Sequence, residues 1–140
     1  MGTVSYAVPF SGDALAERII ELELEREPLM TVVRAVFSRL QALTSALVGD
    51  RGFDALLARA AHLSRAHAPC TLLPKGDLAM EAAAVVEALT KAELGPEEVK
   101  TCSIAIIGKL LDLLSSFIGE DLTRRIVRRE WAQALAGSHD

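Results

Sequence analysis

Residues 29–50 read LMTVVRAVFSRLQALTSALVGD, and this stretch decides the fold. Its apolar side chains recur at spacings of four and three, which places them on one face of an α-helix. They are Leu29, Val33, Val36, Leu40, Leu43 and Leu47. Met30, Phe37 and Val48 widen this stripe, as a helix that faces a protein core requires. The stripe ends at Gly49, because glycine adopts positive φ without strain and commonly terminates a helix.

A second stretch repeats this pattern seventy residues further along the chain. Residues 99–120 read VKTCSIAIIGKLLDLLSSFIGE, and residues 13–61 align with residues 83–131 without a gap. Twelve of these 49 aligned positions are identical. Two unrelated amphipathic helices would share the apolar period by chance, but some matches lie outside that period. These are Gly49 with Gly119 and Arg59 with Arg129. We therefore interpret the two stretches as an internal repeat.

Each unit of the repeat is expected to contain three helices. They span residues 12–26, 28–48 and 51–67 in the first unit and residues 77–94, 96–118 and 121–135 in the second. Residues 68–76, which contain two prolines, are expected to link the units. The predicted fold class is therefore all-α. We expect a single domain over residues 1–140, a bundle of about six helices in two tandem three-helix units related by approximate twofold symmetry.

The two glycine turns carry the residues that are predicted to shape the units. These structural residues are Gly49, Asp50, Gly119, Glu120, Arg59 and Arg129. The glycines are expected to end the long helices, and the acids to begin the next helices, where negative charge interacts favourably with the helix dipole. Arg59 and Arg129 are predicted to clamp the preceding turn or the facing unit through Asp50, Asp54 or Glu120.

Composition and charge limit the class of protein. The chain has 140 residues, of which 51% are hydrophobic and 24% charged, so a wholly disordered chain is excluded. Its net charge of −4 argues against a general polyanion binder. The two cysteines, Cys70 and Cys102, make no disulfide framework, and reduced cysteines in a cytoplasmic protein are expected. The N-terminus lacks the features of a signal peptide, and residues 102–118 are too short and too interrupted for a membrane span.

The mean hydropathy of +0.29 is high for a soluble protein. A thick helical core accounts for it, and so does an apolar surface that a partner or ligand covers. Homo-oligomerisation is the simplest way to cover such a surface.

Four short sequence features occur at the two turns and after them: VGDRGF at residues 48–53, LLAR at residues 56–59, FIGEDLT at residues 117–123, and Trp131. With these features the chain resembles an uncharacterised family of small all-α bacterial proteins. The resemblance covers mainly the two glycine turns and the helices after them. It implies a bacterial, cytosolic origin and no known activity.

No catalytic residue, cofactor-binding residue or metal ligand is predicted. Gly108-Lys109 lies inside an expected helix and lacks the earlier glycine of a phosphate-binding loop. His62, His67 and Cys70 are the nearest approach to a metal set, but the histidines are five residues apart and fall on different helix faces.

A group of arginines near the C-terminus is a candidate interaction site. It consists of Arg124, Arg125, Arg128 and Arg129. Such a cluster could contact phosphates or an acidic partner. Pairing with Glu120, Asp121 and Glu130 at helical spacing is the favoured interpretation, and no aromatic residues are interleaved for base stacking.

These observations favour a non-enzymatic, soluble helical interaction module, a regulatory or adaptor protein that self-associates as a homodimer or binds a protein partner. The alternative is a bundle that binds a small hydrophobic ligand between the repeats, where Cys102, Ser103 and Gly108 leave room. Nucleic-acid binding through Arg124–Arg129 is a third and less favoured interpretation.

Overall fold

The computed structural model describes residues 11–66, 87, 89 and 95–131 of the chain. Of these described residues, 89% are helical and none lies in a strand, which confirms the all-α prediction. The helices are α1 (Gly12–Leu24), α2 (Leu29–Ser64), α4 (Pro96–Ile118) and α5 (Glu120–Glu130). The expected linker at 68–76 and most of the expected helix at 77–94 lie outside the described residues.

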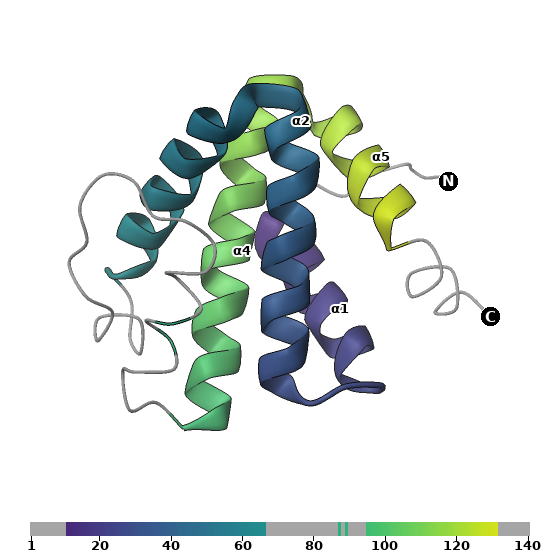
Figure 1. The fold of residues 1–140 in the computed structure, drawn as a ribbon, viewed down its shortest axis with the longest axis vertical. Coiled ribbons are helices and arrows are strands. Elements are labelled where there is room, and N and C mark those ends of the chain that lie inside the picture. The colour runs from purple at the N-terminus through teal and green to yellow at the C-terminus, as the bar shows by residue number, and fades with distance from the viewer. Residues whose placement is uncertain (1–10, 67–86, 88, 90–94, 132–140) are drawn as a thin grey trace, which may run out of the picture.

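The bundle is built around two long helical segments that lie side by side. The first part of α2 and the whole of α4 run in the same direction, and α1 packs against both (Figure 1). The apolar stripe predicted from the sequence supplies the core between them, and α4 adds a matching set. Fully buried members are Val33, Val36, Phe37, Ile106, Ile107, Leu110 and Leu111.

Each long segment is interrupted by a glycine. Gly49 inside α2 has φ 82° and ψ 164°, and Gly119 between α4 and α5 has φ 95° and ψ 152°. Positive φ combined with ψ near 160° is a region that only glycine occupies readily, so each glycine forces the chain out of the helix. Both interruptions lie at the same end of the bundle, from which the second part of α2 and α5 descend on opposite sides (Figure 1). We call residues 47–51 and 117–122, which form this end, the kink end.

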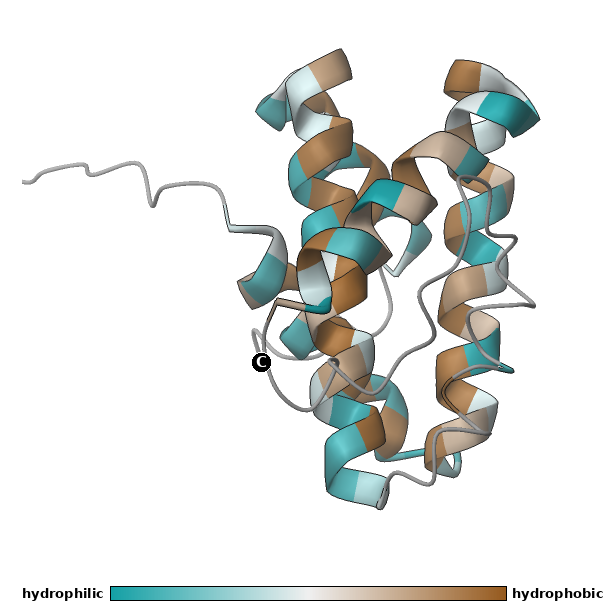
Figure 2. Ribbon diagram, turned by 90° about the vertical axis from the view of Figure 1, so that its left-hand side faces the viewer, coloured by the Kyte–Doolittle hydropathy of each residue, from teal (hydrophilic) through white to brown (hydrophobic). Residues whose placement is uncertain are grey.

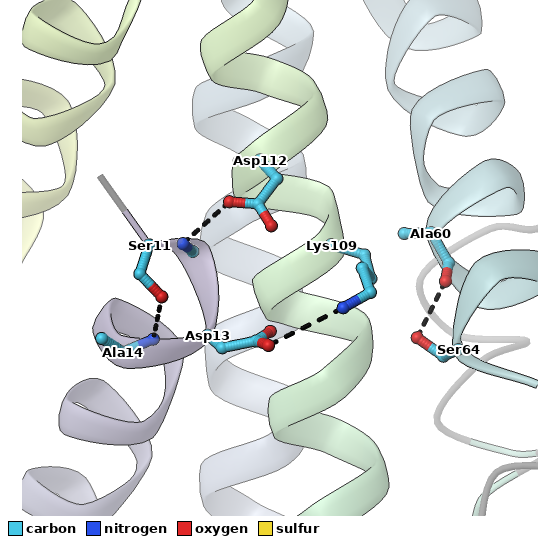
Figure 3. Close-up of polar contacts among 8 residues, drawn as sticks. Ser11, Asp13, Ala14, Ala60, Ser64, Lys109 and Asp112 are labelled. Carbon is cyan, nitrogen blue, oxygen red and sulfur yellow. Dashed lines mark hydrogen bonds and ion pairs between the residues drawn. The ribbon is translucent and has the colours of Figure 1, made fainter. Parts of the chain in front are cut away.

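Helix α1 crosses α4 at a contact between two glycines. A Cβ atom added to Gly12 would lie 2.1 Å from the carbonyl oxygen of Gly108, and one added to Gly108 would lie 2.8 Å from the Cα of Asp13. Backbones approach this closely only where no side chain intervenes. The Asp13 carboxylate also lies 3.7 Å from Lys109 Nζ, which adds an ion pair across the same crossing (Figure 3).

The N-terminus of α1 is capped from two directions. Ser11 Oγ accepts a hydrogen bond from Ala14 N at 3.1 Å, and Asp112 Oδ1 on α4 accepts one from Gly12 N at 2.8 Å (Figure 3). The first amides of a helix have no partner within the helix, and a carboxylate there also interacts favourably with the helix dipole. Asp112 therefore fixes where α1 begins and attaches it to α4.

Replacing Asp112 by alanine is expected to lower the free energy of unfolding by about 2 kcal/mol, because a charged acceptor is removed from a part-buried amide. The Asp112→Asn variant keeps an oxygen acceptor and is expected to lose less than half of that. Urea unfolding measures both values, and hydrogen exchange of the first amides of α1 shows whether the helix end frays. Equal stability of Asp112→Ala and the wild type would refute this role.

An ion pair between Glu21 and Lys100 joins α1 to α4 further along the crossing. The hydrogen bond to the Glu21 carboxylate is the main reason that the pKa of Lys100 is raised above 10.5. Because the pKa is raised in the folded state, the stabilisation from this pair is complete below the ordinary lysine pKa and is lost as the pH rises through the raised value. The ion pair is therefore intact at neutral pH.

The end of α5 is attached to α2 through Arg39. Its guanidinium lies 3.3 Å from the Glu130 carboxylate and 5.7 Å from the centre of the Trp131 ring. Trp131 is 2% exposed, and it is the one tryptophan of the chain. Its fluorescence therefore reports whether α5 is docked.

Helix α4 extends beyond the apolar run of residues 102–118 and, by length and composition only, is long and apolar enough to cross a membrane, with a mean hydropathy of 1.6 over its most apolar window. It contacts α1, α2 and α5, so it is the central helix of the bundle. A central helix needs apolar side chains on several faces, and this position accounts for its composition.

Candidate interaction surface at the kink end

Large apolar side chains are exposed at the kink end. Phe117 is 71% exposed, Leu47 is 46% exposed and Leu122 is 37% exposed, and these are the large hydrophobic residues that stand out to solvent in the described part of the chain. Single exposed apolar residues are common on protein surfaces, but three within two short segments at one end of a bundle make that end a candidate interaction surface.

Two of these residues occupy equivalent positions in the sequence repeat. Leu47 lies two residues before Gly49, and Phe117 lies two residues before Gly119. The sequence pattern placed both in the core-facing stripe, and the structure shows that this prediction is wrong for Leu47 and Phe117. After each glycine the chain turns away from the helix axis, so the helix itself does not continue over the last turn to cover these side chains.

The parallel arrangement of the long helices brings the two apolar positions to the same end of the molecule. Figure 1 shows the α2 interruption and the end of α4 at the same, upper end of the bundle, and Figure 2 shows that the two helix ends diverge there and carry apolar positions among polar ones. Leu122, in the first turn of α5, extends the surface. A shallow hollow beside it is lined by Ile118, Gly119, Glu120, Asp121, Leu122 and Arg125.

Charged residues accompany the apolar ones at the kink end. Asp50 and Arg51 follow Gly49, Glu120 and Asp121 follow Gly119, and all four are exposed. Asp50 and Glu120 were predicted to begin helices, and they stand in the first turn after each glycine. An apolar centre with charged neighbours is the general composition of a protein–protein interface.

The arginine cluster on α5 is divided by the structure. Arg125, Arg128 and Arg129 are exposed and share one helix face, whereas Arg124 is half-buried and already interacts within the chain. Thr123 and Val127 form the buried face of α5. The cluster is therefore a solvated helix flank, with a single member, Arg125, beside the hollow at the kink end.

The predicted arginine clamps are not formed with the three acids named for them, all of which lie in the described part of the chain. Arg59 and Arg129 are both exposed, and no ion pair joins either one to Asp50, Asp54 or Glu120, all of which the structure describes. Positions 50 and 59, like positions 120 and 129, are nine residues apart, which is a rotation of about 180° around an α-helix. Each arginine consequently lies on the opposite side of its helix from the acid at the turn.

The space that the sequence suggested for a hydrophobic ligand is filled at Gly108. The backbone of Asp13 occupies the position that a Gly108 side chain would take, so this glycine admits a neighbouring helix. Cys102 and Ser103 on the same helix are fully buried. At Gly108, therefore, the packing of α1 takes up the space that was predicted for a ligand.

Of the three residues that come nearest to a metal set, the structure describes His62 alone. His62 is exposed, with its Nδ1 3.0 Å from Arg65 Nη2, while His67 and Cys70 lie outside the described residues. Among the residues that are described, no three His, Cys, Asp or Glu side chains are grouped to hold a metal ion.

Comparisons with known proteins give no significant match to a family model, to a characterised protein or to a solved structure.

Proposed function

We propose that the protein is a non-enzymatic helical interaction module of the cytoplasm, a regulatory or adaptor protein that self-associates through its kink end. The observation that carries this proposal is the exposure of Phe117, Leu47 and Leu122 at one end of the bundle. Covering them removes apolar surface from water, which is the main driving force of protein association.

The proposal includes two tandem three-helix units related by approximate twofold symmetry. Two observations support this arrangement. Each unit has a long helix, a positive-φ glycine and a following helix in the same order. Ile19 and Leu89, which are equivalent in the repeat, are both fully buried in the core.

Such an arrangement gives the kink end an approximately symmetric surface, because each unit contributes one exposed apolar side chain before its glycine. Homodimers commonly use surfaces that pair with themselves about a twofold axis. Burying the still-exposed part of these side chains removes apolar surface from water, and a symmetric dimer buries each residue twice. The kink end therefore contributes an apolar driving force to association, which acts against the entropy that association costs.

Replacing Leu47 and Phe117 by serine in one variant is expected to weaken self-association at least about tenfold. The unfolding free energy of the monomer should stay within about 1 kcal/mol of the wild type, because both side chains are exposed and neither belongs to the buried core. Light scattering coupled to size exclusion measures the mass, and thermal unfolding at low concentration measures the stability.

The matched control is Ala35→Ser, an exposed position on α2 fourteen residues before Gly49. It also changes an apolar residue to serine, but far from the kink end, and it should associate like the wild type. Unchanged association of the double variant would contradict the assignment of this surface.

A further inference from the structure

Among the described residues, the two units carry opposite charges at one pair of equivalent positions that are exposed in both. Arg51 is the second residue after Gly49, and Asp121 is the second residue after Gly119. Both are exposed, and neither forms an ion pair with the other in the structure. The kink end therefore carries a positive charge on one side of its approximate symmetry axis and a negative charge at the corresponding place on the other.

Two copies of such a protomer can meet end to end in two ways. In one register the Gly49 turns of the two copies face each other, which sets Arg51 against Arg51 and Asp121 against Asp121. In the other register the Gly49 turn of each copy faces the Gly119 turn of its partner, which sets Arg51 against Asp121 twice. Like charges placed together at an interface oppose association, whereas opposite charges favour it and fix the register.

We propose that the kink end docks onto the kink end of a second copy in the register that opposes Arg51 of each protomer to Asp121 of the other. This inference rests on the proposed function and specifies its geometry. The dimer is isologous, because the same pair of contacts occurs twice about one twofold axis.

The other residues of the surface are compatible with this register. Asp50 and Glu120 are both acidic and equivalent, so they meet an acid in either register and do not decide between them. Phe117 is the more exposed apolar side chain and Leu47 the smaller one. In the proposed register each Phe117 faces a Leu47 of the second copy, so a large side chain meets a smaller one on both sides of the axis.

Charge reversal at the two positions tests the register. The Arg51→Asp variant and the Asp121→Arg variant each convert two attractive contacts into two repulsive ones, and each is expected to weaken the dimer at least about tenfold in low salt. The double variant restores both contacts with their direction reversed, and its dissociation constant should return to within about threefold of the wild type. An equimolar mixture of the two single variants should associate more tightly than either variant alone.

Sedimentation equilibrium in low salt and in about 0.5 M salt gives the dissociation constants, and salt should reduce the difference between variants. Arg34→Asp, an exposed arginine far from the kink end on α2, has the same net charge as Arg51→Asp and controls for general charge effects. Two results would overturn the register but not self-association, provided that the wild type dimerises. In the first, the single variants associate as tightly as Arg34→Asp. In the second, the double variant associates as weakly as the single variants. A wild type that stays monomeric at every concentration would overturn the register and the proposed function together.

Discussion

Replacing Gly108 by alanine is expected to lower the free energy of unfolding by about 3 kcal/mol. Within a helix, glycine to alanine normally stabilises by about 0.5–1 kcal/mol, because alanine restricts the unfolded chain and favours the helix. At Gly108 the added Cβ would lie 2.0 Å from Asp13 Oδ1 and within 3 Å of the Asp13 backbone. A side-chain oxygen can rotate away, but the backbone of α1 can move only if the helix shifts from α4.

Urea unfolding followed by circular dichroism measures this loss. Ser116→Ala on the same helix is the matched control, because it introduces alanine at an exposed position and should change the unfolding free energy by less than about 0.5 kcal/mol. Gly12 lies on the α1 side of the same crossing. The Gly12→Ala variant should also be less stable than the wild type, because the added Cβ would meet the Gly108 carbonyl oxygen. A Gly108→Ala variant that is more stable than the wild type would show that the two helices do not cross at these glycines.

Replacing Gly49 or Gly119 by serine is expected to cost about 1–3 kcal/mol at each position. The reason is conformational and not a matter of space, because a Cβ at either glycine would meet nothing within 4 Å. With φ of 82° and 95° and extended ψ, an L residue is strained at both positions, and the variant would instead favour a continuous helix through the turn. The similar backbone angles predict losses of similar size at the two sites.

Gly95→Ser is the control for these two substitutions. Gly95 has φ −72° and precedes α4 as its N-cap, where serine is a favoured residue. The free energy of unfolding of the Gly95→Ser variant should therefore be unchanged or slightly raised. Thermal unfolding followed by Trp131 fluorescence separates the effects further, because Gly119→Ser should also disturb the docking of α5. A serine at Gly49 or Gly119 that costs no more than the one at Gly95 would contradict the positive-φ turns.

The helices and their interruptions follow from local sequence signals. The four-and-three spacing from Leu29 onward predicts a core-facing helix, and the structure buries Val33, Val36 and Leu40 of that stripe. The helix interruptions fall at Gly49 and Gly119, where the sequence changes from apolar residues to a glycine followed by an acid. The helix spans and their interruptions depend only on residues that are close together in the chain, so they can be predicted from a single sequence.

The crossing of α1 and α4 depends on residues that are distant in the chain. Gly108 and Gly12 are 96 positions apart, and nothing near either glycine identifies the other as its neighbour. In the sequence, Asp112 is a charged residue within the apolar run of residues 102–118. In the structure its carboxylate caps α1, a role that exists only once the two helices meet.

The candidate surface was not predicted because the apolar period does not show where burial stops. Leu47 and Phe117 continue the stripe with the correct spacing. Both are nevertheless exposed, because the chain turns away at the glycine two residues later. Their position in the last turn before a helix-ending glycine is the signal that identifies them. The arginine pairing failed for a related reason, since nine-residue spacing separates Arg59 and Arg129 from the acids at their turns.

Sedimentation velocity of the wild-type protein over a roughly hundredfold range of concentration tests self-association without any substitution. The proposal predicts a mass that rises with concentration from the 15.0 kDa of one chain to that of two chains. A mass of 15.0 kDa that persists up to millimolar concentration would contradict it.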